Sequence, residues 1–257
     1  MTVASVASPP PLGLTLTARH VTYDGITLFR DLTLDLPAGH WTCLLGISGV
    51  GKSSLLRLLA DLAPAGSDYH VQTSDNLPLT DRVAYMAQQD LLLPWLSVLD
   101  NITLGARLRR QPADTTRADS LLEQVGLAQL RHRRPDQLSG GQRQRAALAR
   151  TLMEDRPVVL MDEPFSALDP VTRLQMQDLA ATLLHQRTVL LVTHDPLEAL
   201  RLGEQVLVLT GPPASLAPHP LPADWPAPRA VDDPRLTSQQ GALLARLVHQ
   251  RPAGAVS

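Results

Sequence analysis

The chain contains 257 residues, of which 44% are hydrophobic and 19% are charged, and its formal net charge is −2. This length can bury a full core, and a balanced charge without blocks of like residues argues against nucleic acid as the main partner. Cys43 is the only cysteine, which excludes a disulfide framework and indicates a reducing compartment. No run approaches about 18 consecutive apolar residues, so no membrane span is expected. The start of the chain also lacks the pattern of a secretory signal.

The N-terminal residues predict a leader followed by a β-hairpin. Residues 1–12 contain three consecutive prolines, a composition typical of a flexible leader. Alternating apolar residues in 14–36 are interrupted at Asp24-Gly25, which indicates two strands joined by a tight turn, or a small meander. The apolar run at 40–45 then predicts a buried strand.

A phosphate-binding loop follows this buried strand. Residues 46–53 read Gly-Ile-Ser-Gly-Val-Gly-Lys-Ser and fit the pattern G-x-x-x-x-G-K-[ST] in full. Its glycines let backbone N–H groups approach phosphates, Lys52 can reach the β- and γ-phosphates, and the Ser53 hydroxyl can bind Mg²⁺. Residues 53–60 predict a helix whose positive end faces the same point. The alternative, a glycine-rich turn without a ligand, does not account for this strand–loop–helix setting.

The rest of the chain predicts an inserted helical lobe and a mostly parallel sheet. Helical spacing at 98–110 and 118–125, with no strand signal, indicates a lobe over about residues 90–150. Strands alternating with helices of ordinary length favour a parallel sheet. Strands are expected at 83–87, 157–161, 188–192 and 205–209, with a helix at 170–186. The predicted fold class is an α/β P-loop NTPase with a mostly parallel central sheet, a small antiparallel β subdomain and an inserted helical subdomain.

Two adjacent carboxylates, Asp162 and Glu163, end one predicted buried strand. Buried carboxylates are costly unless they meet a cation or hydrogen-bond donors, so this placement indicates function. Asp162 suits the surroundings of Mg²⁺, and Glu163 can take a proton from an attacking water. The alternative is that both residues cap the next helix and face solvent.

Polar residues also follow two neighbouring predicted strands. His194 comes after the apolar run 189–192, and Gln88 comes after the strand at 83–87. Because the carboxyl ends of parallel strands meet at one edge of a sheet, both can reach the same place as Glu163. A single histidine after a strand can also be structural, and the spacing alone does not separate Gln88 from Gln89.

A second glycine motif, Leu-Ser-Gly-Gly-Gln at 138–142, completes a characteristic order. With the P-loop, Gln88, the two carboxylates and His194, it makes the chain resemble the ATP-binding cassette (ABC) family over about residues 14–210. The resemblance implies that ATP contacts Tyr23, Gly46, Ser48, Gly49, Val50, Gly51, Lys52, Ser53, Ser54, Ser139, Gly140, Gly141, Gln142 and Asp169. It also implies that Ser53, Gln88 and Asp162 hold Mg²⁺, and that Glu163, His194 and Gln88 are catalytic, with Glu163 as the general base.

The resemblance further implies partners and domain limits. Two copies are expected to sandwich two ATP molecules, so that each Ser139 loop completes the site of the other copy. The expected limits are a leader at 1–12, the ATPase domain at 13–211 and a C-terminal extension at 212–257. Eight prolines among residues 212–234 predict an irregular surface segment, and 242–249 predict a short amphipathic helix.

The segment 91–95, Leu-Leu-Leu-Pro-Trp, narrows the resemblance to one group of importers. It is similar to cassettes that serve nitrate, taurine, alkanesulfonate or pyrimidine thiamine-precursor uptake. Such a subunit works at the cytoplasmic face of the inner membrane, peripherally, with permease subunits and indirectly with a solute-binding protein. The alternative for Trp95 is packing within the helical lobe.

Two other functions remain as alternatives. A soluble cassette ATPase without a membrane partner would usually carry two cassettes, a long coiled coil or a strongly basic surface, and none of these is found in the sequence. A P-loop kinase would leave the motif at Ser139 without a purpose.

Overall fold

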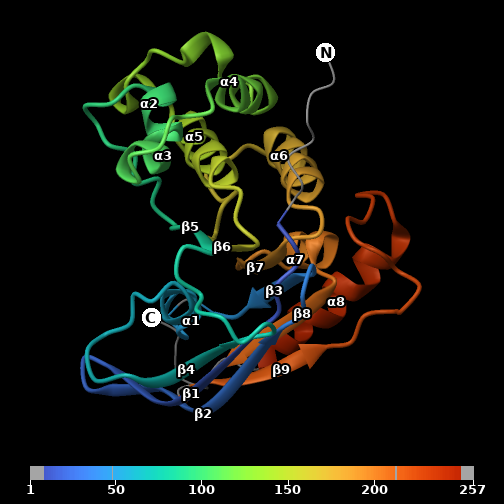
Figure 1. Ribbon diagram of the computed structural model, residues 1–257. Helices are drawn as coiled ribbons and strands as arrows, with labels where there is room; N and C mark the ends of the chain where they lie inside the picture. The colour runs from blue at the N-terminus through green and yellow to red at the C-terminus, as the bar shows by residue number, and fades with distance from the viewer. Residues whose placement is uncertain (1–8, 48, 212, 250–257) are drawn as a thin grey trace.

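Two β-sheets organise the chain in the computed structural model, which describes residues 9–47, 49–211 and 213–249 (Figure 1). The smaller sheet has the order β2-β1-β4, with bounds β1 Leu14–Tyr23, β2 Ile26–Leu36 and β4 Asp68–Thr73. The larger sheet has the order β5-β6-β7-β3-β8-β9. Its strands are β3 Trp41–Leu45, β5 Val83–Met86, β6 Val158–Asp162, β7 Thr188–Val192, β8 Gln205–Thr210 and β9 Ser215–His219.

The predicted hairpin is confirmed, and a third strand joins it. Strands β1 and β2 pair antiparallel from Leu14↔Leu36 to Tyr23↔Ile26, around a turn at Asp24-Gly25. Strand β4, for which the sequence carried no clear signal, pairs antiparallel with the other edge of β1. Its residues alternate between exposed and half-buried up to Thr73, which is buried, as in a strand that turns one face toward a core.

The larger sheet is parallel from β5 to β8, as the alternation of strands and helices predicted. Strands β3, β6 and β7 are buried at every residue, because this sheet has cover on both faces. Successive side chains of β3 point to opposite faces of the sheet and enter different hydrophobic cores. Cys43 packs in the core that includes residues of the helical lobe, and Leu44 packs in the core that includes residues of the β1–β2 hairpin. The carboxyl ends of β3, β6 and β7 therefore meet at one edge.

Helices cover the sheet and form a separate group beyond β5 and β6 (Figure 1). The helices next to the sheets are α1 Lys52–Leu59, α6 Pro170–Leu183, α7 Pro196–Leu202 and α8 Pro234–His249. The helical lobe contains α2 Val98–Ile102, α3 Leu104–Leu108, α4 Thr115–Gln124 and α5 Gly140–Met153. Helix was predicted at 98–110, and the structure divides it at Thr103. Within the described residues, no helix combines the length and apolarity that a membrane crossing requires.

Residues 212–234 were predicted to be irregular, and this prediction is wrong for β9, which pairs antiparallel with β8. The prolines misled the prediction because a strand at the end of a sheet tolerates a residue such as Pro218 that donates no hydrogen bond. The C-terminal helix is also longer than predicted, since α8 begins at Pro234. Leu236 and Leu243 on this helix are buried in the core. The limits of the predicted domains stay predictions.

The chain between β9 and α8 is fixed to the end of α7. Trp225 is buried, and the guanidinium of Arg229 lies 4.3 Å from the centre of its ring. Arg229 Nη1 donates to the carbonyl oxygens of Leu200 and Gly203, where α7 ends. The indole nitrogen of Trp225 donates to Asp233 at 2.7 Å. These contacts order a proline-rich stretch that the sequence predicted to be an irregular surface segment.

Candidate functional site

The P-loop runs from the end of β3 to the start of α1, and two of its glycines are sterically required. A Cβ atom on Gly46 would lie 2.7 Å from the carbonyl oxygen of Leu209, a distance that real Cβ atoms do not adopt. Gly51 has φ of +106°, and a Cβ there would also press on the Phe29 ring at 3.1 Å. Gly49 has positive φ as well, Val50 is buried, and Ser48 lies outside the described residues. The loop backbone can therefore approach a ligand closely.

Lys52 is the buried cation of this loop. Its ammonium donates to the carbonyl oxygens of Gly46 at 2.8 Å and Ile47 at 3.0 Å. Burial lowers the pKa of Lys52, and the nearby charges of Glu163 and Asp162 act against that shift. A partly desolvated cation within a glycine-rich loop that leads into a helix fits the phosphates of a nucleotide.

Asp162 is the buried carboxyl at the end of β6. Burial raises its pKa, while a hydrogen bond from Ser53 and the charge of Lys52 act in the opposite direction. The structure thus brings the Ser53 hydroxyl and the Asp162 carboxyl together, as the sequence predicted. An oxygen donor set of this kind, beside a phosphate-binding loop, fits Mg²⁺.

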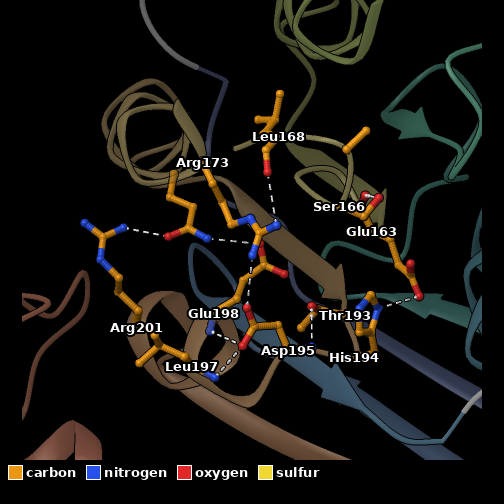
Figure 2. Close-up of polar contacts among 12 residues, drawn as sticks. Glu163, Ser166, Leu168, Arg173, Thr193, His194, Asp195, Leu197, Glu198 and Arg201 are labelled. Atoms are coloured by element: carbon orange, nitrogen blue, oxygen red, sulfur yellow. Dashed lines mark hydrogen bonds and ion pairs between the residues drawn. The ribbon is translucent and has the colours of Figure 1, made fainter. Parts of the chain in front are cut away.

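Glu163 lies at the meeting point of three strand ends. Its Oε1 atom is 3.1 Å from Nδ1 of His194 (Figure 2), and its Oε2 atom accepts a hydrogen bond of 3.3 Å from Gln88. These residues follow β6, β7 and β5, so the predicted convergence of the three side chains is present. The contact to Glu163 comes from Gln88, which favours it over Gln89. The backbone of Glu163 has φ of +49°, a left-handed conformation that non-glycine residues seldom adopt.

A buried amide on α5, Gln144, holds the loop that begins at Glu163. Its Nε2 atom donates to the Glu163 carbonyl oxygen at 3.2 Å, and its Oε1 atom accepts from the Ala167 N–H at 2.8 Å. The sequence reasoning missed this residue. The available signal was its position on the apolar side of the helix, three residues before Ala147 and seven before Thr151, which are also buried.

The Leu-Ser-Gly-Gly-Gln motif begins α5 with a capping box. The Ser139 hydroxyl accepts from the Gln142 N–H at 3.3 Å, and the Gln142 side chain accepts from the Ser139 N–H at 2.9 Å. Gly140 and Gly141 are the first two residues of the helix, which runs to Met153. Ser139 and Gly140 are exposed, so this end of α5 is open to a ligand or partner.

Three further predicted contacts lie on separate elements. Tyr23, at the end of β1, is 48% exposed, and it lines a cavity of about 250 Å³ together with Ser54 and Arg57. Asp169 caps α6, where its carboxylate accepts from the Thr172 N–H at 3.0 Å. Hydrogen bonds from Thr172 lower the pKa of Asp169. Asp169 is thus already engaged in its own chain.

Trp95 does not pack within the helical lobe. Its side chain is 66% exposed, and that of Leu91 in the same segment is also exposed. The alternative interpretation of Trp95 as a packing residue is therefore wrong. A large exposed aromatic beside exposed leucine is typical of a surface that meets a partner.

Comparison with known proteins agrees with this site. A family model described as ABC transporter matches residues 29–166. The chain is 47% identical to an uncharacterized ABC transporter ATP-binding protein of Haemophilus influenzae, over 88% of this chain and 94% of that protein. It is 45% identical to the aliphatic sulfonates import ATP-binding protein SsuB 2 of Streptomyces avermitilis, over 86% of this chain and 85% of that protein.

A solved structure shows the same fold. The ATP-binding cassette MJ0796, in a dimeric post-hydrolysis state bound to ADP and Pi, matches with a TM-score of 0.67 and 29% identity. The match covers 76% of this chain and 93% of that one. The mostly parallel sheet, the antiparallel β subdomain and the helices are thus those of a known cassette. The chain belongs to the ABC transporter family and is one of its ATP-hydrolysing cassettes.

Proposed function

We propose that this cassette is the energising subunit of a membrane importer and works as a dimer that encloses two ATP molecules. The observation that carries the importer assignment is the exposed Trp95, which lies a short distance along the chain from Gln88. An exposed aromatic at that place suits contact with another protein. The import function in the names of the relatives supports the same conclusion.

The residues of the site divide into binding and reacting groups. Lys52 and the N–H groups of the P-loop would neutralise the β- and γ-phosphates. Ser53, Gln88 and Asp162 would hold Mg²⁺, which supplies positive charge against the phosphate oxygens when it is bound. Tyr23 would stack on the adenine, with Ser54 beside it.

Glu163 is proposed as the general base, because its carboxylate is held between Gln88 and His194. Glu163 would take the proton of the attacking water, and His194 would orient that carboxylate and contact the γ-phosphate. The Ser139 hydroxyl and the first N–H groups of α5 would face the nucleotide of the other copy, in company with Asp169.

The proposed partners are a second copy, permease subunits and, through them, a solute-binding protein; nucleic acid is not among them. The cassette would lie at the cytoplasmic face of the inner membrane as a peripheral subunit. The proposed cargo is a small solute of the nitrate, taurine, alkanesulfonate or pyrimidine type. Several relatives are named for aliphatic sulfonates, which favours a sulfonate. The pocket that selects it would belong to other chains.

Trp95→Ala tests the docking surface. Because the side chain is exposed, we expect the melting temperature and the basal ATPase of the isolated subunit to stay close to those of the unchanged protein. Co-purification with the permease, and transport, should fail, since aromatic anchors carry much of the binding energy of an interface. The measurements are a melting curve, a transport assay and a pull-down with the permease subunit proposed as partner.

Leu77→Ala is the matched control, because Leu77 is an exposed apolar residue between β4 and β5, outside the helical lobe. It should leave permease binding intact. Intact binding in Trp95→Ala as well would contradict the docking proposal. A large fall in its melting temperature would instead assign Trp95 a structural role.

A further inference from the structure

One arginine on α6 joins the two loops that carry Glu163 and His194. Arg173 Nη2 donates to the carbonyl oxygen of Leu168 at 3.1 Å, in the loop that begins at Glu163. Arg173 Nη1 lies 3.6 Å from Oδ2 of Asp195, the residue directly after His194. Figure 2 shows the guanidinium between Leu168 and Asp195, beside the pair formed by Glu163 and His194.

Asp195 is itself fixed by the helix that it begins. Its Oδ1 atom accepts from the Leu197 N–H at 2.9 Å, and its own N–H donates to the Thr193 hydroxyl at 3.0 Å. The backbone around His194 is therefore held by α7 on one side and by Arg173 on the other. On the Glu163 side, Gln144 holds the same loop that Leu168 ends. Arg173 connects these two anchored loops.

A second arginine, Arg201, joins α7 to α6 and contacts Gln177 and Asp178 in place of the two loops. Arg201 of α7 donates to Gln177 at 2.9 Å and forms an ion pair with Asp178 on α6. The nearby Glu198 carboxyl is buried, and burial raises its pKa to about 7. The charge of Arg173 acts against that shift, and the Arg201–Asp178 pair provides an internal comparison.

We propose that Arg173 is a positioning residue for ATP hydrolysis, which sets the distance between His194 and Glu163 by tying the Leu168 carbonyl to Asp195. His194 is exposed, so surrounding side chains do not fix its place, and the position of its backbone decides whether it meets Glu163. A misplacement of about 1 Å in a reacting group can cost roughly 10²-fold in rate. The inference rests on the ATPase activity and on the roles proposed above for Glu163 and His194, and it does not depend on the importer assignment.

Arg173→Met tests this role, because methionine keeps an apolar side chain of similar length while removing the guanidinium. We expect kcat for ATP hydrolysis to fall by roughly 10-fold or more, with KM for ATP changed by less than about 3-fold. The matched control is Asp178→Ala, which breaks the other ion pair on the same helix. Asp178→Ala should leave kcat near that of the unchanged protein. We expect a small fall in melting temperature, similar for Asp178→Ala and Arg173→Met.

A double variant shows whether Arg173 acts through Asp195. Asp195→Asn keeps an oxygen that can cap α7 but removes the charge that faces Arg173. If the two residues work through one contact, the Arg173→Met/Asp195→Asn protein should turn over no more slowly than the slower single variant. Losses that multiply would overturn the proposal, as would a kcat in Arg173→Met equal to that of Asp178→Ala. A melting temperature far below the control with a matching rise in KM would show a merely structural role and would also overturn it.

Discussion

Glu163→Gln is expected to retain ATP binding while ATP turnover falls by roughly 10²-fold or more. Glutamine has the same shape as glutamate, so the left-handed backbone at this position and the contact with Gln88 can persist. An amide cannot accept the proton of the attacking water, and the chemical step should therefore slow. In the presence of ATP and Mg²⁺, the protein should accumulate as a dimer on gel filtration.

The control for this variant is Glu123→Gln, which changes an exposed carboxylate on α4 in the same way. It should hydrolyse ATP at the rate of the unchanged protein. Unchanged turnover in a well-folded Glu163→Gln protein would remove Glu163 from the role of general base.

Ser139→Arg is expected to spare ATP binding by one subunit and to abolish cooperative hydrolysis. The reason is that Ser139 would contact only the nucleotide held by the other copy, where a long cation would obstruct closure of the dimer. ATP affinity measured at low protein concentration should stay close to that of the unchanged protein. The Hill coefficient and kcat of the ATPase should both fall.

Ser139→Ala separates obstruction from loss of the helix cap. Both substitutions remove the hydroxyl that accepts from the Gln142 N–H, and such a loss costs about 1 kcal/mol of stability. Only arginine adds bulk, so alanine should keep part of the cooperativity. Equal losses of binding and turnover in Ser139→Arg would place Ser139 in the site of its own subunit, against the proposed sandwich.

Local sequence signals were sufficient to predict most strands of the larger sheet. The apolar runs of β3, β6 and β7 are buried at every residue, and such strands produce a signal that needs no knowledge of their partners. The edge strands were harder to predict, since β4 is mostly polar and β9 contains a proline. Their strand conformation depends on pairing with β1 and β8, which a local pattern does not record.

The residues of the site likewise divide into those that the sequence predicted and those that it did not. Glycine, lysine and serine of the P-loop follow one another in sequence, and the strand-end residues were expected to converge because parallel strands share an edge. The contacts of Gln144 with Ala167 and of Arg173 with Asp195 each join positions about twenty residues apart on different elements. Side-chain direction decides such contacts, and spacing alone does not fix it.

The pairing of β9 with β8 has a consequence for any shortened form of the protein. A chain ending at Thr210 would leave β8 with a row of unpaired N–H and C=O groups, flanked by the buried side chains of Val206 and Val208. An unpaired apolar strand of this kind is a template for intermolecular association. In the full chain β9 forms that edge of the sheet instead, and Pro218 within it has no N–H to offer to another strand. A chain shortened before β9 is therefore expected to aggregate more readily than the full chain.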